Sequence, residues 1–379
     1  MRLLHLADLH LGKNIGNYSL IEDQRHGLNQ ILDIIEKENI DVVMIAGDIY
    51  DTPVPSSEAL KLYSDFIEKI IFTYNKIVLA IAGNHDSGRR LDNNLRFFSK
   101  SNYHLHGDYR GYISSGVHNG EIITLNDEYG KVHFHLIPFM TISQANLYFS
   151  DEINTFTDVY RNLLKDKNYE DRNVLISHCY ANHITEETED AYKEGQKPLL
   201  IGGTDAMDAH LFLDFDYVAL GHLHSEHFVV DPKIRYSGTF MKYSFDEVGN
   251  KKTVTIVDLT DEIKTRKVII NPLRDFRKIT GTFEQIMSTE ADSDDYIKFE
   301  LTDELVVTNA MSDLKKKFPH AVSISYTNNG VFNVEGELNL DLENKDTLEL
   351  FEEFYRFKMD EDMTVEQIEA LKEVINWNQ

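Results

Sequence analysis

Residues 41–48, with the sequence Asp-Val-Val-Met-Ile-Ala-Gly-Asp, constrain the fold of this chain more than any other stretch. The apolar, β-branched centre of this run is typical of a strand buried on both faces of a parallel sheet. Packing gives no reason for the carboxylate of Asp48 at its end. Because chemistry in open α/β sheets gathers just beyond the carboxyl ends of the strands, Asp48 predicts a functional site there.

Four other apolar runs end in the same manner. They cover residues 1–7, 77–82, 173–176 and 215–220, and the sequences at their ends are Asp8-Leu9-His10, Gly83-Asn84-His85-Asp86, Ser177-His178 and Gly221-His222-Leu223-His224. The segments between the first three runs are long enough for helical crossovers, so we expect right-handed βαβ units. The repetition of one design at five strand ends predicts a single shared site.

The strand ends supply carboxylate, imidazole and amide groups, which are ligands of divalent first-row metal ions. The seven candidate ligands are Asp8, His10, Asp48, Asn84, His178, His222 and His224. A single catalytic zinc ion usually takes three protein ligands, so this set is too large for one ion. Two ions roughly 3.5–4 Å apart would use all seven, with the central Asp48 as the bridging carboxylate.

Composition places the chain among soluble globular proteins with a sizeable core. It has 379 residues, of which 42% are hydrophobic. We expect a cytoplasmic protein without a membrane segment, because the start lacks a signal-peptide pattern and no apolar run approaches the ~20 residues that span a bilayer. The single cysteine, Cys179, agrees with a reducing compartment and is expected to be a small buried residue.

The net charge of −26 argues against long-range attraction of nucleic acid by the whole protein. It does not exclude nucleic acid as a substrate, because bound metal ions are large local positive charges. No P-loop or dinucleotide-binding glycine pattern occurs in the sequence.

Hydrophobic patterning predicts three regions: a metal-binding domain at 1–275, a small α+β unit at 276–345 and two helices at 346–379. In the first region, the runs at 132–139, 228–230, 252–259 and 266–270 are expected to form a second sheet packed on the first, and residues 145–165 to form a helix. His133 and His135 are expected on the outer face of their strand and not as ligands. Two C-terminal helices are expected, one over 347–359 and one that begins at Thr364. They either pack on their own domain or bind a partner protein.

The five motifs, in this order, resemble the full motif series of the calcineurin-like metallophosphoesterases. Residues 5–12, 83–87, 215–224 and 236–238 are similar in more detail to the SbcD family, the bacterial relatives of the double-strand-break repair nucleases. The resemblance is strong over 1–275 and covers the remainder only by layout. It implies a four-layer α-β-β-α sandwich with a small α+β capping domain and C-terminal helices. A departure at Thr239-Phe240-Met241 affects the expected shape of one loop only.

Carried onto this sequence, the resemblance implies one metal ion held by Asp8, His10, Asp48 and His224, and a second held by Asp48, Asn84, His178 and His222. Manganese is the usual ion of the family. The ions activate water for attack on phosphorus and neutralise charge on the phosphate oxygens. His85 is expected to protonate the leaving oxygen or stabilise the transition state, with Asp86 orienting its ring.

Three basic residues near the motifs are weaker candidates. Lys13 follows the first motif, and Arg89 and Arg90 follow the third, where an arginine can hold a backbone phosphate. A solvent-facing charged turn is an equally good interpretation of this stretch.

The resemblance implies a metal-dependent DNA nuclease that degrades duplex ends and cuts single strands or hairpins. In this family the subunit works in DNA repair and recombination with an SbcC-type coiled-coil ATPase, as a homodimer within a heterotetramer. Two other functions are considered, one that is also a hydrolase and one that is not an enzyme. The first is a dimetal phosphatase or cyclic-nucleotide phosphodiesterase, although protein phosphatases of this fold carry Asp-Arg-Gly where this chain has Asp51-Thr52-Pro53. The second is a non-catalytic scaffold, which predicts missing ligands, and none of the seven is missing.

Overall fold

A computed structural model describes residues 1–92, 101–109, 121–165, 170–183, 206–290 and 294–327, with isolated positions between 348 and 372. The chain divides into two compact units: Met1–Lys278 with Asp292–Lys298 and Phe318–Ser323, and Ile279–Ala291 with Phe299–Lys317 and Ile324–Gln379. The first unit contains every strand end that the sequence marks as a site.

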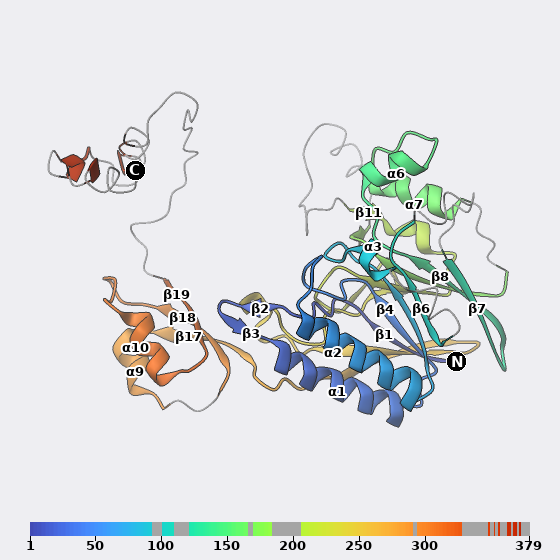
Figure 1. Cartoon of the computed structure of the whole chain (residues 1–379), viewed down its shortest axis with the longest axis horizontal. Coiled ribbons are helices and arrows are strands. Elements are labelled where there is room, and N and C mark those ends of the chain that lie inside the picture. Colours follow the sequence, from blue (N-terminus) through green and yellow to red (C-terminus); the bar gives the residue numbers. More distant parts are fainter. Residues whose placement is uncertain are drawn as a thin grey trace. The chain divides into compact units, whose positions relative to one another are not determined.

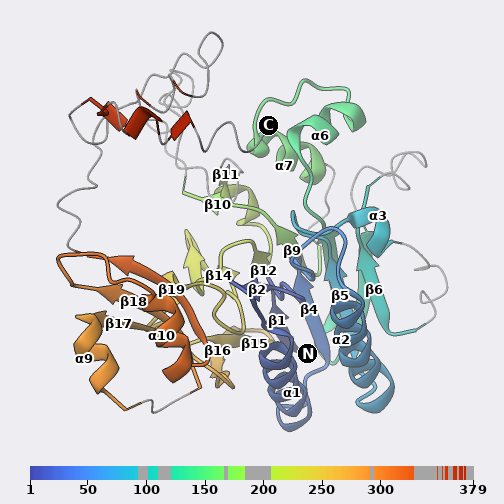
Figure 2. The same ribbon diagram turned by 60° about the vertical axis from the view of Figure 1, so that its left-hand side comes forward.

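The first sheet of this unit has six strands in the order β16-β15-β1-β4-β5-β6. Their bounds are β1 Arg2–Leu6, β4 Val42–Ala46, β5 Ile77–Ile81, β6 Tyr103–His106, β15 Thr253–Leu259 and β16 Ile263–Ile269. The strands β1, β4, β5 and β6 run parallel and lie side by side in Figure 2. Their carboxyl ends therefore meet at one edge of the sheet.

The second sheet also has six strands, in the order β13-β14-β12-β9-β8-β7. Their bounds are β7 Glu121–Asp127, β8 Gly130–Ile137, β9 Arg172–His178, β12 Tyr217–Gly221, β13 His227–Val229 and β14 Asp231–Tyr236. The strands β8, β9, β12 and β14 are parallel, and β7 and β13 add antiparallel edges. Gly221 pairs with His178, so the motifs that follow β9 and β12 are neighbours.

The prediction that residues 252–259 and 266–270 join the second sheet is wrong. These residues form β15 and most of β16, an antiparallel hairpin that extends the first sheet beside β1. Val254 and Ile256 pack on the helix side of that sheet, whereas Val257 and Leu259 pack between the two sheets. Both faces of β15 are apolar, so the strand pattern alone did not identify the sheet that it joins.

The central strand β4 is apolar throughout because its alternate residues face two different apolar layers. Val43 and Ile45 pack against the helices α1 Ile21–Lys37 and α2 Ser57–Glu68. The π-helical turn η1 Lys69–Thr73 continues α2. Val42, Met44 and Ala46 pack against the second sheet. The outer face of that sheet carries α6 Ile142–Tyr148, α7 Phe156–Leu164 and η2 Ala209–Phe212.

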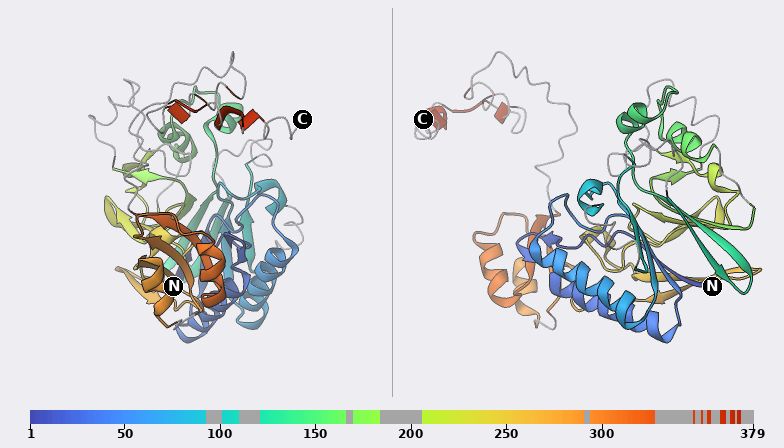
Figure 3. Two further views of the ribbon diagram at one scale, coloured as in Figure 1. Left: turned by 90° about the vertical axis from the view of Figure 1, so that its left-hand side faces the viewer. Right: turned by 45° about the vertical axis from the view of Figure 1, so that its right-hand side comes forward.

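The layers of the first unit therefore follow the order helix, sheet, sheet, helix, as the sequence predicts. Figure 1 and the right-hand view of Figure 3 show α1 and α2 on one side of the two sheets and α6 and α7 on the other. Shorter elements complete the unit: β2 Asn14–Ile15, β3 Tyr18–Ser19, α3 Gly88–Leu91, β10 Ala181–Asn182, β11 Met207–Asp208 and η3 Phe245–Glu247.

Residues 145–165 do not form the single helix that the sequence predicts. The Asn146 side chain at the end of α6 donates to Ile153 O at 2.7 Å and accepts from Ile153 N at 3.0 Å, which turns the chain. Thr155 then caps a new helix, α7, and shares a capping box with Asp158. Local side-chain hydrogen bonds thus override the helical pattern.

The two histidines of β8 differ from each other. His133 is half-buried and lies 2.8 Å from the Thr124 hydroxyl, whereas His135 is buried and its Nε2 lies 2.8 Å from Asn173 Oδ1. Both histidines lie on the outer face of the sheet, as expected, because Val132, Phe134 and Leu136 pack between the two sheets. The strand pattern did not predict that His135 is buried on that face, beside Phe215. Neither histidine belongs to a group of potential metal ligands among the described residues.

A separate three-stranded sheet follows residue 275, in the order β17-β18-β19. Its strands are β17 Phe276–Gly281, β18 Tyr296–Leu301 and β19 Ala321–Tyr326, and the helices α9 Phe283–Ser288 and α10 Ala310–Lys317 lie between them in sequence. The helices expected over 347–359 and from Thr364 lie outside the described residues, apart from isolated positions. The division at 275 and 345 stays a prediction.

Candidate metal centre

The five motifs converge because the parallel strands of both sheets end at the same place. Asp8 and His10 follow β1, Asp48 follows β4 and Asn84 follows β5; His178 ends β9, and His222 and His224 follow β12. The loops after β1 and β4 are joined by hydrogen bonds from Asp8 N to Gly47 O at 3.0 Å and from His10 N to Asp48 O at 2.9 Å. Two facing sheets, and not one, therefore supply the site.

Four of the predicted ligands have left-handed backbone conformations. Their φ values are 54° for Asp8, 42° for His10, 49° for Asp48 and 105° for His222. Such conformations are unfavourable for residues other than glycine and are concentrated at functional sites. Here the turn at each strand end places the side chain beyond the sheet edge.

Glycines beside the ligands allow close backbone contacts at the site. A Cβ atom on Gly221 would lie 1.9 Å from Ala46 O of the first sheet, and one on Gly83 would lie 2.2 Å from Asp48 Oδ1. Neither position can hold a larger residue without a shift of the backbone. Gly221 is thus required where the two sheets meet, and Gly83 where the loops after β4 and β5 of the first sheet meet.

One group of ligand atoms is formed by Asp8, His10 and His224, which all lie within 4.8 Å of one another. His10 Nε2 is 3.2 Å from His224 Nε2 and 3.7 Å from Asp48 Oδ2. Two imidazole nitrogens and two carboxylates thus face a common point. This donor set fits one divalent ion.

A second group includes Asp48 itself. Asp8, Asp48 and His178 form a group with ligand atoms within 4.8 Å, and His178 Nε2 is 3.5 Å from Asp48 Oδ2. Asn84 Oδ1 lies 2.9 Å from His178 Nε2 and 3.1 Å from His222 Nδ1. Asp48 Oδ2 thus lies within 3.7 Å of an imidazole nitrogen of each group, and Asp8 belongs to both groups.

Surrounding hydrogen bonds prepare several of these side chains as ligands. His178 Nδ1 donates to Ala46 O at 2.9 Å, so the lone pair of the neutral ring is on Nε2, the atom that faces Asp48. Burial lowers the pKa of His178 and of His10, which favours the neutral form that binds metal ions. The backbone N–H of His222 donates to both carboxylate oxygens of Asp8, at 3.0 and 3.1 Å.

Without a cation the buried carboxylates of the site repel each other. Asp8 is fully buried, and burial together with the charge of Asp48 raises the pKa of Asp8 well above its ordinary value. A divalent ion between the carboxylates would offset this repulsion. The chemistry of the donor set and its burial therefore both fit a metal centre.

His85 lies beside the first group of ligands and forms a further group of potential ligand atoms with His10 and Asp51. Its backbone N–H donates to Asp48 Oδ1 at 2.8 Å, and its ring is 4.8 Å from that of His10, centroid to centroid. Its Nδ1 lies 2.9 Å from the backbone carbonyl of Asp51, which leaves Nε2 as the atom for chemistry.

The expectation that Asp86 orients the His85 ring is wrong. The Asp86 carboxylate accepts three backbone N–H bonds, from Ile49 at 3.0 Å, Tyr50 at 2.9 Å and Gly83 at 2.9 Å. It joins the loops after β4 and β5, and the Asp51 carbonyl holds the His85 ring instead. Burial, aided by the charge of Asp48, raises the pKa of Asp86 to about 7.

Sequence reasoning missed several supporting residues. Glu247 Oε1 lies 3.6 Å from His224 Nδ1 and pairs with Lys252. Burial alone would raise the pKa of Glu247. The His224 imidazole and the Lys252 charge outweigh this effect and lower the pKa of Glu247 to about 2. Gln24 of α1 donates to His10 O at 2.7 Å. The strand-end pattern carries no signal for these residues, which come from other parts of the chain.

The three basic candidates take different positions. Lys13 pairs with Asp51 at 2.7 Å and is held at the margin of the site. Arg89 and Arg90 are exposed on α3, and Arg89 lies 3.9 Å from Asp108. None of the three belongs to a group of potential metal ligands in the described part of the chain.

The fold and the convergence of potential metal ligands are those of a metallophosphoesterase, and comparison with known families agrees. The family described as calcineurin-like phosphoesterase matches residues 1–226. The family described as type 5 capsule protein repressor C-terminal domain matches residues 272–358. The SbcD subunit of the nuclease SbcCD from Staphylococcus epidermidis is 30% identical over 386 residues, covering 100% of this chain and 98% of the relative.

The chain therefore belongs to the SbcD family of calcineurin-like phosphoesterases. A solved structure, described as GAP50, the anchor in the inner membrane complex of Plasmodium, has 12% identity and a TM-score of 0.42, covering 72% of this chain and 85% of that one. Among the described residues no helix combines the length and apolar character needed to cross a bilayer.

Proposed function

We propose that this chain is the metal-dependent nuclease subunit of an SbcCD-type complex and hydrolyses phosphodiester bonds of DNA. The observation that carries the proposal is that seven carboxylate, amide and imidazole side chains from two sheets, Asp48 among them, meet at one place with His85 beside them. Membership of the SbcD family supports DNA as the substrate.

Two divalent ions complete the proposed site. Asp8, His10, Asp48 and His224 would hold one, and Asp48, Asn84, His178 and His222 the other, with Mn²⁺ as the proposed ion. When bound, the ions supply Lewis acidity that activates water and neutralises phosphate charge. The short contacts of Asp48 with both sides of the site support its role as the bridge.

The protein groups position the scissile phosphate and move a proton. His85 donates Nδ1–H to the Asp51 carbonyl, so a protonated ring presents Nε2–H to the leaving oxygen. In this proposal Asp86 is a positioning residue that fixes the loop carrying His85. Lys13 and the α3 arginines would contact the DNA backbone at the margin.

An assay with purified protein tests the activity. With Mn²⁺ we expect cleavage of end-labelled duplex, hairpin and single-stranded DNA, and little turnover of a phosphopeptide or a cyclic nucleotide. Turnover of only the last two substrates would replace the nuclease by the phosphatase or phosphodiesterase alternative. No turnover of any substrate with metal ions bound would favour the scaffold.

We further propose a cytoplasmic location and an SbcC-type coiled-coil ATPase as the partner, with two copies of this chain in a heterotetramer. The family to which the chain belongs supports an ATPase partner. We propose that the residues from 346 onward attach it, and truncation before Thr347 should abolish co-purification with the ATPase. Retained binding would place the attachment elsewhere.

A further inference from the structure

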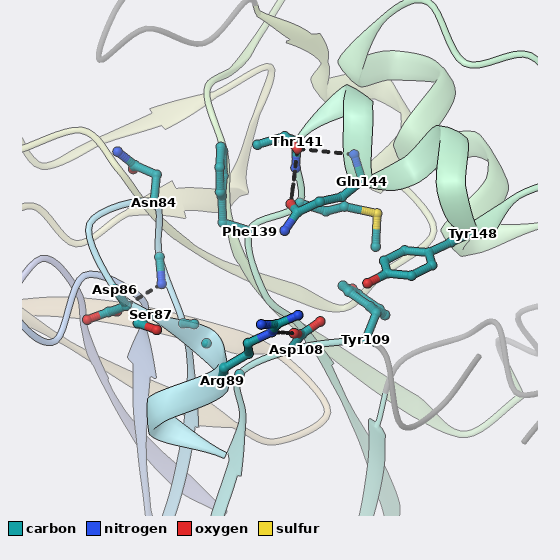
Figure 4. A pocket seen from close by; sticks show the side chains of 15 residues that line it. Asn84, Asp86, Ser87, Arg89, Asp108, Tyr109, Phe139, Thr141, Gln144 and Tyr148 are labelled. Atoms are coloured by element: carbon teal, nitrogen blue, oxygen red, sulfur yellow. Dashed lines mark hydrogen bonds and ion pairs between the residues drawn. The ribbon is translucent and has the colours of Figure 1, made fainter. Parts of the chain in front are cut away.

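A hollow adjoins the metal centre and shares Asn84, Asp86 and Arg89 with the function proposed above, whereas Phe139, Gln144 and Tyr148 of its wall have no part in that function. It has a volume of about 270 Å³ and lies between the loop after β5, the loop after β6 and the start of α6. Figure 4 shows it with the side chains that form its wall. The wall includes Asn84, Arg89, Asp108, Phe139, Gln144 and Tyr148.

Two residues connect this hollow to the metal centre. Asn84 lines it, and the Asn84 amide oxygen is within 3.1 Å of both His178 and His222. The Phe139 ring lies 6.3 Å from the His178 ring, centroid to centroid, and Phe139 N donates to Ala82 O at 3.0 Å. A phosphate held at the metal centre would therefore have one of its nucleosides at the mouth of the hollow.

The wall combines aromatic rings with polar groups that converge on the interior. Phe139 and Tyr148 supply rings, and Figure 4 shows the Gln144 amide and the Arg89 guanidinium directed toward the middle. The Gln144 Oε1 accepts from Thr141 N at 2.8 Å and from the Thr141 hydroxyl at 3.1 Å. The Nε2 end of the amide is thus set by the helix cap and can donate to a ligand.

The charges around the hollow favour the base of a nucleotide over its phosphate. Arg89 is the basic residue of the lining, and it lies 3.9 Å from the Asp108 carboxylate, which lines the hollow as well. A second phosphate would compete with Asp108 for Arg89 and be repelled by that carboxylate, so the hollow is unsuited to it. A neutral, planar group with apolar faces and hydrogen-bonding edges suits the wall better.

We propose that this hollow binds the nucleobase next to the scissile phosphate. The ring contacts the aromatic side chains, and its edge accepts a hydrogen bond from Gln144. The volume of about 270 Å³ suits one base and lies just below the range of ligand pockets, roughly 300–1,000 Å³. The base must leave the stack to enter, so unpaired nucleotides are favoured substrates. This inference rests on the proposed nuclease function.

Oligonucleotides with a single abasic residue test the inference. Single-stranded DNA is cleaved with Mn²⁺, and products are mapped at nucleotide resolution beside the same strand with all its bases. Cleavage at one phosphate flanking the abasic residue should fall about tenfold, the order of one lost base–aromatic contact. Equal cleavage of both strands at both flanking phosphates would overturn the inference but leave the nuclease function. Absence of cleavage of either strand would overturn the proposed function itself.

Two variants test whether the lower cleavage beside an abasic residue depends on the hollow. Gln144→Glu keeps the oxygen that caps α6 but replaces the donating amide by an acceptor, and Tyr148→Ala removes one ring. Each should reduce the intact-to-abasic cleavage ratio toward one. Leu147→Ala, on the same helix but 80% exposed and outside the wall, should keep the wild-type ratio. A wild-type ratio in both pocket variants would overturn the proposal, and comparable unfolding temperatures verify that all the proteins are folded.

Discussion

The ligands of the metal centre are positioned by unusual backbone conformations and by glycines that precede them. Gly47, Gly83 and Gly221 each precede a predicted ligand, and a methyl group on any of them would lie less than 3.0 Å from an atom of the site. The ligands that follow Gly47 and Gly221 have positive φ values. The site therefore depends on backbone shape as well as on the ligand side chains.

Gly221→Ala should disturb the site without changing any ligand. The added methyl group would lie 1.9 Å from Ala46 O and 2.8 Å from His178 Nδ1, so the two sheets must separate. We expect a loss of about 1–3 kcal/mol in the free energy of unfolding, together with weaker Mn²⁺ binding. Urea unfolding and metal titration measure these effects.

Gly249→Ala is the matched control for this prediction. Nothing lies within 4 Å of its added methyl group, although its φ is +89°. It should lose about 1 kcal/mol from backbone strain and bind Mn²⁺ normally. Similar metal affinities for the two variants would contradict the argument from close packing.

His85→Ala should lower kcat by about 10²–10⁴-fold and leave metal binding intact, because His85 supplies a proton and no ligand atom in this proposal. Steady-state cleavage of DNA and metal titration are measured on the same protein. The control is His133→Ala, a half-buried histidine of the second sheet that contacts Thr124 and Asp171. Unchanged turnover of the His85 variant would remove His85 from the chemistry.

At the scale of elements, side-chain caps decide where the helices over the second sheet begin. Thr141 caps α6 and Thr155 caps α7, each through a capping box. Between them, Asn146 binds both backbone polar groups of Ile153. Because α6 also carries Gln144 and Tyr148, these caps position one wall of the proposed base site.

Thr155→Ala should destabilise the protein by about 1 kcal/mol, because the Asp158 N–H loses its acceptor. Ser143→Ala, at an exposed position inside α6, should change the free energy of unfolding by less than about 0.5 kcal/mol. Denaturant unfolding of both variants measures the difference. Equal stability of the two would show that the capping bond contributes nothing.

At the scale of the molecule, the metal centre connects two sheets that otherwise meet through an apolar core. Asp8, His10, Asp48 and Asn84 come from the first sheet, and His178, His222 and His224 from the second. Ions bound between them should therefore stabilise the packing of one sheet on the other.

Mn²⁺ should raise the unfolding temperature, and a chelator should reverse the change. An ion that binds only the folded state contributes about 2.7 kcal/mol at a concentration 100 times its Kd. Differential scanning fluorimetry with Mn²⁺ and with EDTA measures the shift. Asp48→Asn should abolish most of it and His133→Ala should preserve it; a full shift in the Asp48 variant would refute the bridging role.

The sequence alone determined the strand ends, the candidate ligands and the alternating arrangement of strands and helices. A buried strand requires a continuous apolar run, so a polar residue at its end stands out locally. The tertiary structure alone decided that β15 and β16 join the first sheet, that Asp51 and not Asp86 holds His85, and that Glu247 supports His224. These contacts join residues far apart in the chain, and their partners depend on how the sheets and loops pack.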